Sequence, residues 1–351
     1  MGCMIRFVSR TSLAIGLLLA AQACGGGDEG DGAGGQVQDS GGDESDAGID
    51  AEQDAALPDA PSSEGAADAG EDAVDVVVSL EVVEAEPEEA AVVPRNRPLR
   101  FRFANAVVRS TLSVEVNGQA VRVVSTDDTT FRYAPLTLFD PDSDYTIRIA
   151  GGVTDVDGAV LQADWTRSFR TDGDTTDVNG DPAWTAEEVD LILSGAQNEP
   201  MDLVQDYATA QSALYDVNAP VLLPDGTTDH LVERMIVSMS HHGGVGLAAP
   251  QVGIPRRLFV ARIAGETRAF PNPVLTAFAD EVDSYVEGCL SVPSTPTQVL
   301  RPTWVELSYE AQDGVLVPFE RIENGTGIHA RVWLHEFDHL NGILLLARAG
   351  Y

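Results

Sequence analysis

Residues 25–92 form a long stretch whose composition limits where this chain can fold. The stretch contains no aromatic residue and consists mainly of Gly, Ala, Asp, Glu and Ser. Such a segment buries too little apolar surface to offset the entropy lost on ordering. We therefore predict a solvated acidic tether, interrupted by one apolar run at 73–83 that is either a strand or an apolar patch. Compact structure is expected mainly in residues 93–351.

The charge of the chain excludes one class of partner. The formal net charge is −35, and all 21 basic residues are arginine. No basic residue occurs between Arg10 and Arg95, while Asp and Glu are scattered through residues 28–89. Proteins that bind nucleic acids or other polyanions present clustered basic surfaces. We therefore predict that this protein has no nucleic-acid partner.

The amino terminus has the features of an export signal. Arg6 and Arg10 precede an apolar run at 13–23 that is too short to span a membrane as a stable helix. The run ends at Cys24, and this order resembles a bacterial lipoprotein signal. The resemblance implies that residues 1–24 are a signal segment and that a lipid on Cys24 anchors an exported protein in the periplasm or at the cell surface. A plain secretory signal is the alternative, and the protein is cytoplasmic if the signal is misread.

Residues 93–172 show the pattern of several short strands. Apolar and polar side chains alternate in LRFRFANAVV, TLSVEVNGQAVRVVS and YTIRIAGGV, with turn residues between the runs. Asn117 followed by Gly118 is the strongest short signal for a β-hairpin. The order of the segments resembles the bacterial Ig-like domains, which implies an all-β sandwich. Because no cluster of catalytic residue types occurs in it, we expect a spacer or adhesion module that contacts partners at the cell surface.

Residues 173–183 are predicted to link this region to the next one. From Asp177 to Glu188, oxygen-bearing side chains occur at the spacing of a calcium-binding loop. Pro182, however, stands where such a loop needs glycine for its sharp turn. We favour the simpler interpretation of an acidic linker in which Thr185 caps the following helix.

Residues 184–351 mix helical and strand patterns. Helical periodicity is found at 186–195, 229–243 and 327–341, whereas RRLFVARI at 256–263 is typical of a strand. Helices and strands that do not alternate regularly argue for an α+β domain.

The sequence HEFDH at 335–339 fits the pattern H-E-x-x-H. On a helix, His335 and His339 lie one turn apart on the same face, so both imidazoles can reach one metal ion, with Glu336 beside them. The alternative is a surface-exposed pair of helical histidines.

Cys289 is a candidate for a third metal ligand. A catalytic metal site commonly has three protein ligands and one open position. If the signal is removed and Cys24 carries a lipid, Cys289 has the only free thiol in the chain. Metal binding would explain a thiol that has no disulfide partner.

Three short segments occur in a characteristic order. They are GVGLAAPQ (244–251), EGCLS (287–291) and HEFDH (335–339), and together they closely resemble the three motifs of peptide deformylases. The resemblance covers about residues 200–351. It implies an α+β fold with small β-sheets around a central helix that carries H-E-x-x-H. In that family the metal is usually ferrous iron, with zinc as a substitute.

The resemblance also implies roles for single residues. Cys289, His335 and His339 would hold one Fe²⁺ or Zn²⁺ ion, and sequence alone does not decide between the two. Glu336 would act as general base, so that metal-bound hydroxide attacks the formyl carbon of formyl-methionyl peptides and formate is released.

Four further positions match the family's substrate site. The side-chain amide of Gln251 and the backbone N–H of Leu290 would stabilise the oxyanion that forms during hydrolysis. The main chain at Val245 and Gly246 would pair with the extended peptide substrate. Glu287 is expected to hold a loop or Arg301 rather than to react.

Departures from the family and the predicted export leave other functions open. Leu334 stands where many deformylases have Gln, and Arg331 and Trp333 are unusual in a helix that is commonly more apolar; these affect substrate preference more than chemistry. Outside the cytoplasm, the substrate would be secreted or scavenged formyl-peptides or another N-acyl amide. A non-catalytic surface protein that retains the metal site is one alternative. A zinc endopeptidase is another, although its third ligand would normally lie downstream of the histidines.

Overall fold

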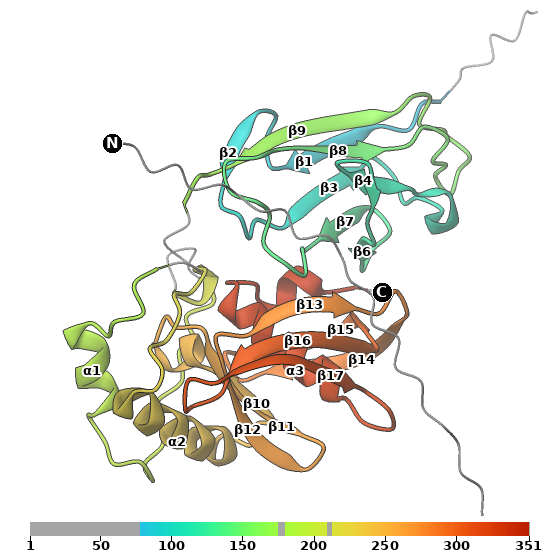
Figure 1. Ribbon diagram of the computed structural model, residues 1–351. Coiled ribbons are helices and arrows are strands. Elements are labelled where there is room, and N and C mark those ends of the chain that lie inside the picture. The colour runs from blue at the N-terminus through green and yellow to red at the C-terminus, as the bar shows by residue number, and fades with distance from the viewer. Residues whose placement is uncertain (1–77, 175–179, 209–212, 351) are drawn as a thin grey trace, which may run out of the picture. The chain divides into compact units, whose positions relative to one another are not determined.

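The computed structural model describes residues 78–174, 180–208 and 213–350 (Figure 1). The predicted signal segment with Cys24, the tether up to residue 77 and Asp177 lie outside these described residues. Among the described residues, no helix combines the length and the hydropathy needed to cross a membrane.

Residues 82–171 form two β-sheets around one hydrophobic core, which confirms the predicted all-β sandwich. Aromatic side chains fill this core: the rings of Phe101 and Phe131 stack with centroids 5.7 Å apart, and Phe103 meets both edge-on. The first sheet has the order β1 (Val82–Glu86), β3 (Leu99–Phe103), β7 (Thr130–Tyr133) and β6 (Val124–Ser125). The second has the order β2 (Ala91–Val93), β9 (Trp165–Thr171), β8 (Asp144–Ile149), β4 (Val114–Val116) and β5 (Gln119–Ala120). A short 3-10 helix, η1 (Arg109–Thr111), precedes β4.

The predicted hairpin is present between β4 and β5. Asn117 and Gly118 occupy its tip with φ angles of 49° and 74°. A two-residue turn with both φ angles positive matches the twist of the flanking strands, and Asn-Gly tolerates it best.

The tether predicted for 25–92 is wrong in its last part, because β1 and β2 belong to the sandwich. Strand β1 pairs antiparallel with β3, and β2 pairs parallel with β9. Ala85 is buried, while Glu84 and Glu86 of the same strand face outward toward Arg100. These outward glutamates gave the strand the acidic composition of the tether that precedes it.

Thr185 and Glu188, which follow the predicted linker, have structural roles at the start of a helix. Thr185 caps helix α1 (Ala186–Ile192), and Glu188 completes a capping box with it. Both carboxylate oxygens of Glu188 also accept hydrogen bonds from Arg256 at 2.7 Å. Glu188 therefore stabilises the packing of α1 and is not available as a calcium ligand.

The second folded region contains three small sheets and, among the described residues, three α-helices. Helix α1 is followed by α2 (Gly226–His241) and α3 (His329–Leu340). One sheet comprises β10 (Gly246–Ala248), β11 (Leu258–Ile263) and β12 (Glu266–Pro271). Another comprises β13 (Val274–Phe278), β16 (Trp304–Glu310) and β17 (Leu316–Glu323), and the third β14 (Val282–Cys289) and β15 (Val292–Pro302). Short 3-10 helices are η2 (Ala213–Tyr215), η3 (Ala249–Val252) and η4 (Leu345–Arg348).

Helix α3 lies among these sheets and is buried on almost every side (Figure 1). Trp333 is fully buried, stacks on Phe337 with ring centroids 4.8 Å apart and meets Phe259 of β11 edge-on at 5.7 Å. Leu334 is fully buried as well. Four of the charged or histidine residues of α3 are buried as well, namely Arg331, Glu336, Asp338 and His339, so the interior must supply partners for them. The α+β architecture with a central helix is therefore confirmed.

Candidate active site

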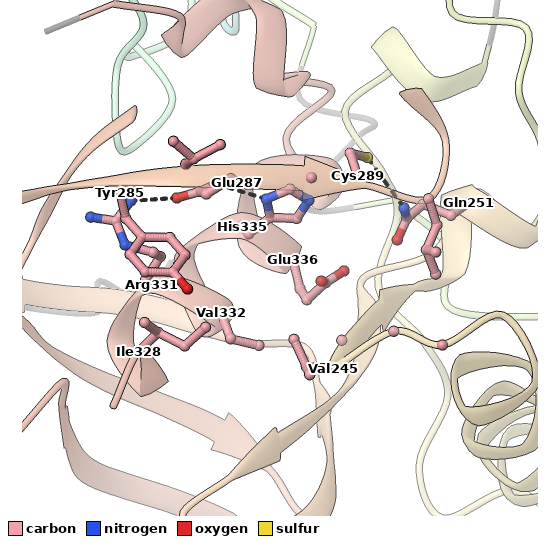
Figure 2. A pocket seen from close by; sticks show the side chains of 16 residues that line it. Val245, Gln251, Tyr285, Glu287, Cys289, Ile328, Arg331, Val332, His335 and Glu336 are labelled. Carbon is pink, nitrogen blue, oxygen red and sulfur yellow. Dashed lines mark hydrogen bonds and ion pairs between the residues drawn. The ribbon is translucent and has the colours of Figure 1, made fainter. Parts of the chain in front are cut away.

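Helix α3 and the end of strand β14 bring one thiol and two imidazoles together. His335 and His339 lie one helical turn apart, and their ring centroids are separated by 5.2 Å. Cys289 is the last residue of β14, and its Sγ lies 3.3 Å from Nε2 of His339. One ligand atom from each of the three residues lies within 4.8 Å of the others. Figure 2 shows Cys289, His335 and Glu336 around the same pocket.

The chemistry of these groups fits a divalent cation. A thiolate with two imidazoles is a donor set that suits zinc or ferrous iron. Nδ1 of His335 lies 2.9 Å from a carboxylate oxygen of Glu287, which leaves Nε2 of the same ring for another partner. A metal-binding histidine is commonly oriented in this way by a carboxylate. In the described part of the chain, Oε2 of Glu336 is buried and has no hydrogen-bond partner, as expected beside a site that holds a further ligand.

The pKa values of Cys289 and Glu336 are shifted in opposite directions. Burial alone would raise the pKa of the Cys289 thiol, but the charge of His339 and hydrogen bonds from both histidines outweigh it and lower this pKa to about 5. The thiolate that binds metals is thus the favoured form at neutral pH. Burial raises the pKa of the Glu336 carboxyl to about 7, because the opposing attraction of the two histidines is smaller. A group with this pKa can both take and release a proton near neutral pH.

Glu287 joins the imidazole of His335 to two buried arginines. Its carboxylate accepts hydrogen bonds from Arg301 at 2.7 and 2.9 Å and from Arg331 at 2.6 Å. Burial would raise the pKa of Glu287, but Arg301 and His335 outweigh it and hold this pKa far below its ordinary value. The expectation that Glu287 holds Arg301 is therefore confirmed.

Asp338 and the function of Arg331 were not predicted from the sequence. Asp338 is 3% exposed and binds Arg301 and Arg348, so it fixes the far side of the same arginine that holds Glu287. Arg331 is 2% exposed. The available signal was the position of Arg331 on a helix expected to be central in the domain, because a buried charge requires a partner.

Gln251 and Gly246 lie against the reacting groups. The Gln251 side chain is 2% exposed, and its Oε1 accepts a hydrogen bond from the backbone N–H of Ala248 at 2.8 Å. Its Nε2 therefore points the other way, 3.7 Å from Sγ of Cys289 and 3.4 Å from Oγ of Ser291. A Cβ atom added at Gly246 would come within 2.7 Å of Cδ of Glu336. Only glycine lets this strand pass so close to the carboxylate.

A pocket of about 370 Å³ collects these residues. Seven of the eight residues predicted from the sequence line it, and His339 lies just beneath, in contact with Cys289. Val245 is 47% exposed at the pocket and Leu290 follows Cys289 in the turn between β14 and β15. The seven lining residues are Val245, Gly246, Gln251, Cys289, Leu290, His335 and Glu336. A volume of this size suits a small ligand or the end of a peptide.

Two family models match the chain. The model of the polypeptide deformylases matches residues 204–350, and the model of the bacterial Ig-like domain matches residues 77–171. The resemblances to the peptide deformylases and to the bacterial Ig-like domains are thereby confirmed.

Several proteins are similar to the second folded region. A peptide deformylase of Treponema pallidum is 43% identical over 138 residues, which are 39% of this chain and 83% of that protein. A peptide deformylase of Thermotoga neapolitana is 42% identical over 129 residues, which are 37% of this chain and 76% of that protein. The crystal structure of peptide deformylase from Thermotoga maritima is 36% identical, with a TM-score of 0.40, and the match covers 43% of this chain and 99% of that chain.

Proposed function

The chain belongs to the peptide deformylase family and is a hydrolase of the deformylase type, and we propose that it removes the formyl group from N-formylated peptides. The reaction would release formate and a peptide with a free amine. The observation that carries this proposal is the convergence of Cys289, His335 and His339 beside the buried carboxyl of Glu336. No single one of these groups is specific, but metal-dependent hydrolysis of an amide needs metal ligands and a proton-transferring group in one place, and these four residues provide both.

Cys289, His335 and His339 are the residues that would hold the divalent cation. When bound, the cation supplies Lewis acidity toward the formyl oxygen and lowers the pKa of a water molecule, so that a nucleophile exists at neutral pH. The donor set suits zinc and ferrous iron. A ferrous ion bound to a thiolate is sensitive to oxidation. If the protein is exported to an aerobic cell envelope, zinc is therefore the expected metal.

Glu336 is proposed to move the protons of the reaction. Its carboxylate form accepts a proton from the attacking water, and the resulting acid donates that proton to the leaving amine. A pKa of about 7 makes both steps feasible near neutral pH. Gly246 packs against the Glu336 side chain and keeps the carboxyl in position.

Two donors are proposed to stabilise the oxyanion. Gln251 is well placed because its Oε1 is fixed by Ala248 and its Nε2 is directed toward Cys289. The backbone N–H of Leu290, the residue after Cys289, is the second donor. Donors that are fixed before the reaction stabilise developing charge without reorganisation, and the loss of one commonly lowers kcat by about 100- to 1,000-fold.

Strand β10 is proposed to bind the peptide main chain. It pairs antiparallel with β11, with Gly246 opposite Ala261, and the carbonyl of Val245 accepts a hydrogen bond from the N–H of Arg262. In an antiparallel pair, bonded and non-bonded positions alternate, so the N–H and C=O of Gly246 point away from β11. An extended peptide can pair with this free edge.

We also propose that the protein is exported and anchored through a lipid on Cys24, with the Ig-like domain available for partners at the cell surface. The support is the sequence around residues 6–24 and the composition of the tether. Labelled palmitate should be incorporated in a bacterial host and should be absent from a Cys24→Ala variant. An unlabelled protein in the cytosolic fraction would contradict export.

A formate-release assay on the full chain tests the proposed reaction. Formyl-Met-Ala-Ser should be hydrolysed after loading with Zn²⁺ or Fe²⁺ and not after metal removal, and acetyl-Met-Ala-Ser tests the alternative of a wider N-acyl amidase. Glu336→Gln should keep its metal and lose turnover. Glu320→Gln, the same chemical change outside the pocket, is the matched control and should retain turnover. Full activity of Glu336→Gln would remove Glu336 as the base.

A further inference from the structure

The pocket has an apolar part and a polar part. Val245, Ile328 and Val332 contribute aliphatic side chains near the reacting groups. Tyr285 and Arg331 line the pocket on the side of strand β14, and Figure 2 shows the Tyr285 ring beside Arg331. A substrate side chain in this pocket can therefore contact both aliphatic groups and the phenol of Tyr285.

Tyr285 presents an unused hydrogen-bond donor. It precedes Glu287 by two residues on β14, so both side chains lie on the same face of the strand. The side chain is 50% exposed, and its ring lies 5.6 Å from the guanidinium carbon of Arg331. Within the described part of the chain, the Tyr285 hydroxyl has no hydrogen-bond partner. The stacked ring holds this hydroxyl at the pocket.

Arg331 supports the tyrosine ring and has no terminal nitrogen left for a ligand. Its Nη1 donates to Glu287 and to the carbonyl of Val299, and its Nη2 donates to the carbonyl and the carboxylate of Asp283. Its Nε is buried. The guanidinium is therefore a fixed platform for a cation–π contact, not an anion-binding group.

The charges around this end of the pocket balance. Three arginines, Arg301, Arg331 and Arg348, are paired with three carboxylates, Asp283, Glu287 and Asp338. The pocket also contains the carboxyl of Glu336, and the whole chain carries a net charge of −35. A negatively charged side chain of a substrate would gain no net electrostatic attraction from these paired charges. A neutral side chain can accept a hydrogen bond from the Tyr285 hydroxyl without an electrostatic cost.

We propose that Tyr285 is a specificity-determining residue, and that the pocket selects a first side chain with an apolar stem and a neutral hydrogen-bond acceptor at its end. The amide of glutamine and the sulfoxide of oxidised methionine have this chemistry. The aliphatic residues contact the stem, and the hydroxyl of Tyr285 donates to the terminal oxygen. This inference rests on the proposed deformylase function, because it assigns the substrate class of the same site.

The test compares four peptides, formyl-X-Ala-Ser, in which X is norleucine, methionine sulfoxide, glutamine or glutamate. kcat/KM for formate release is measured with the metal-loaded full chain, with Tyr285→Phe and with Tyr145→Phe. Tyr285→Phe removes only the hydroxyl and keeps the ring on Arg331. Tyr145→Phe is the matched control, since it removes a phenolic hydroxyl from β8 of the Ig-like domain, where that oxygen accepts a hydrogen bond from the N–H of Asp140.

We expect glutamine and methionine sulfoxide to be hydrolysed at least as well as norleucine, and glutamate less well than glutamine. In Tyr285→Phe, the preference for each neutral polar side chain over norleucine should fall about 3- to 10-fold, the effect of one lost hydrogen bond between neutral groups. Tyr145→Phe should leave it unchanged. An unaltered preference in Tyr285→Phe, a tenfold preference for norleucine in the natural protein, or glutamate above glutamine would overturn the inference. If no peptide releases formate, the proposed function itself fails and this inference with it.

Discussion

Replacing Glu287 by glutamine should destabilise the protein far more than the same change at a surface ion pair. The substitution keeps the size of the side chain and removes the charge that two buried arginines share. The side chain of Glu287 is 6% exposed, and those of Arg301 and Arg331 are 1% and 2% exposed. Removing one partner of a buried ion pair costs about 3–5 kcal/mol. Arg301 keeps Asp338 and Arg331 keeps Asp283, so we expect the lower end, about 3 kcal/mol.

Urea unfolding of metal-free protein, followed by tryptophan fluorescence, measures this difference in the free energy of unfolding. Metal must be removed first, because a bound ligand adds its own stabilisation. Glu320→Gln is the control, since Glu320 pairs with Arg268 at positions where the side chains are 23% and 31% exposed. A partly exposed pair contributes about 1 kcal/mol at most. A loss in Glu287→Gln no larger than that in Glu320→Gln would refute the reasoning.

The difference in stability between the natural protein and Glu287→Gln should depend on pH in a defined direction. In the folded state the pKa of Glu287 lies far below its ordinary value of 4.5, while the unfolded chain is expected to have that ordinary value. A depressed pKa contributes stability that is complete above pH 4.5 and is lost as the pH falls. The difference between the natural protein and Glu287→Gln should therefore shrink below pH 4.5. A difference that grows in acid would contradict this assignment.

The other predictions concern the metal site and the base. Cys289→Ser should lose most of the bound zinc in elemental analysis, because a hydroxyl is a poor substitute for a thiolate ligand, and unchanged zinc content would exclude the thiol as an important ligand. With a pKa of about 7 for Glu336, kcat/KM should fall about tenfold per pH unit well below pH 7, since the base must be ionised; a flat profile down to pH 5 would exclude this role. Gly246→Ala should lower kcat by about 100-fold by displacing Glu336, whereas Gly226→Ala, where an added Cβ meets nothing within 4 Å, should not; equal activity of the two variants would show that the contact is unimportant.

Local patterns in the sequence were sufficient to identify the candidate metal ligands and the candidate base, which the structure brings together. The helical period places His335 and His339 on one face, and that geometry depends only on residues within five positions. Cys289 was suggested by its isolation as a thiol and by the motif around it, and the structure places its Sγ 3.3 Å from His339.

Arg331 could not be interpreted from local patterns. Its partners, Asp283 and Glu287, belong to a strand more than forty residues away in the sequence. Charge pairing over such a distance leaves no periodic signal. For the same reason the role of Tyr285 becomes visible only once β14 is placed beside α3.

Strand β1 was hidden for a different reason. Its outward-facing glutamates made the segment resemble the acidic tether, although its inward residue Ala85 is buried. Pairing with β3 and ion pairs from Arg100 and Arg102 to Glu84 stabilise the strand. Whether such a segment forms a strand depends on its pairing with a neighbouring strand, and the local amino-acid composition does not reveal that pairing.

X-ray absorption at the zinc edge of the reconstituted full chain tests the central claim most directly. We predict one sulfur at about 2.3 Å and two imidazole nitrogens at about 2.0–2.1 Å from the zinc ion, with a light atom in the remaining position. In Cys289→Ser the sulfur contribution should disappear from whatever zinc remains. A shell of nitrogen and oxygen without sulfur in the natural protein would contradict the joint binding of one cation by Cys289, His335 and His339.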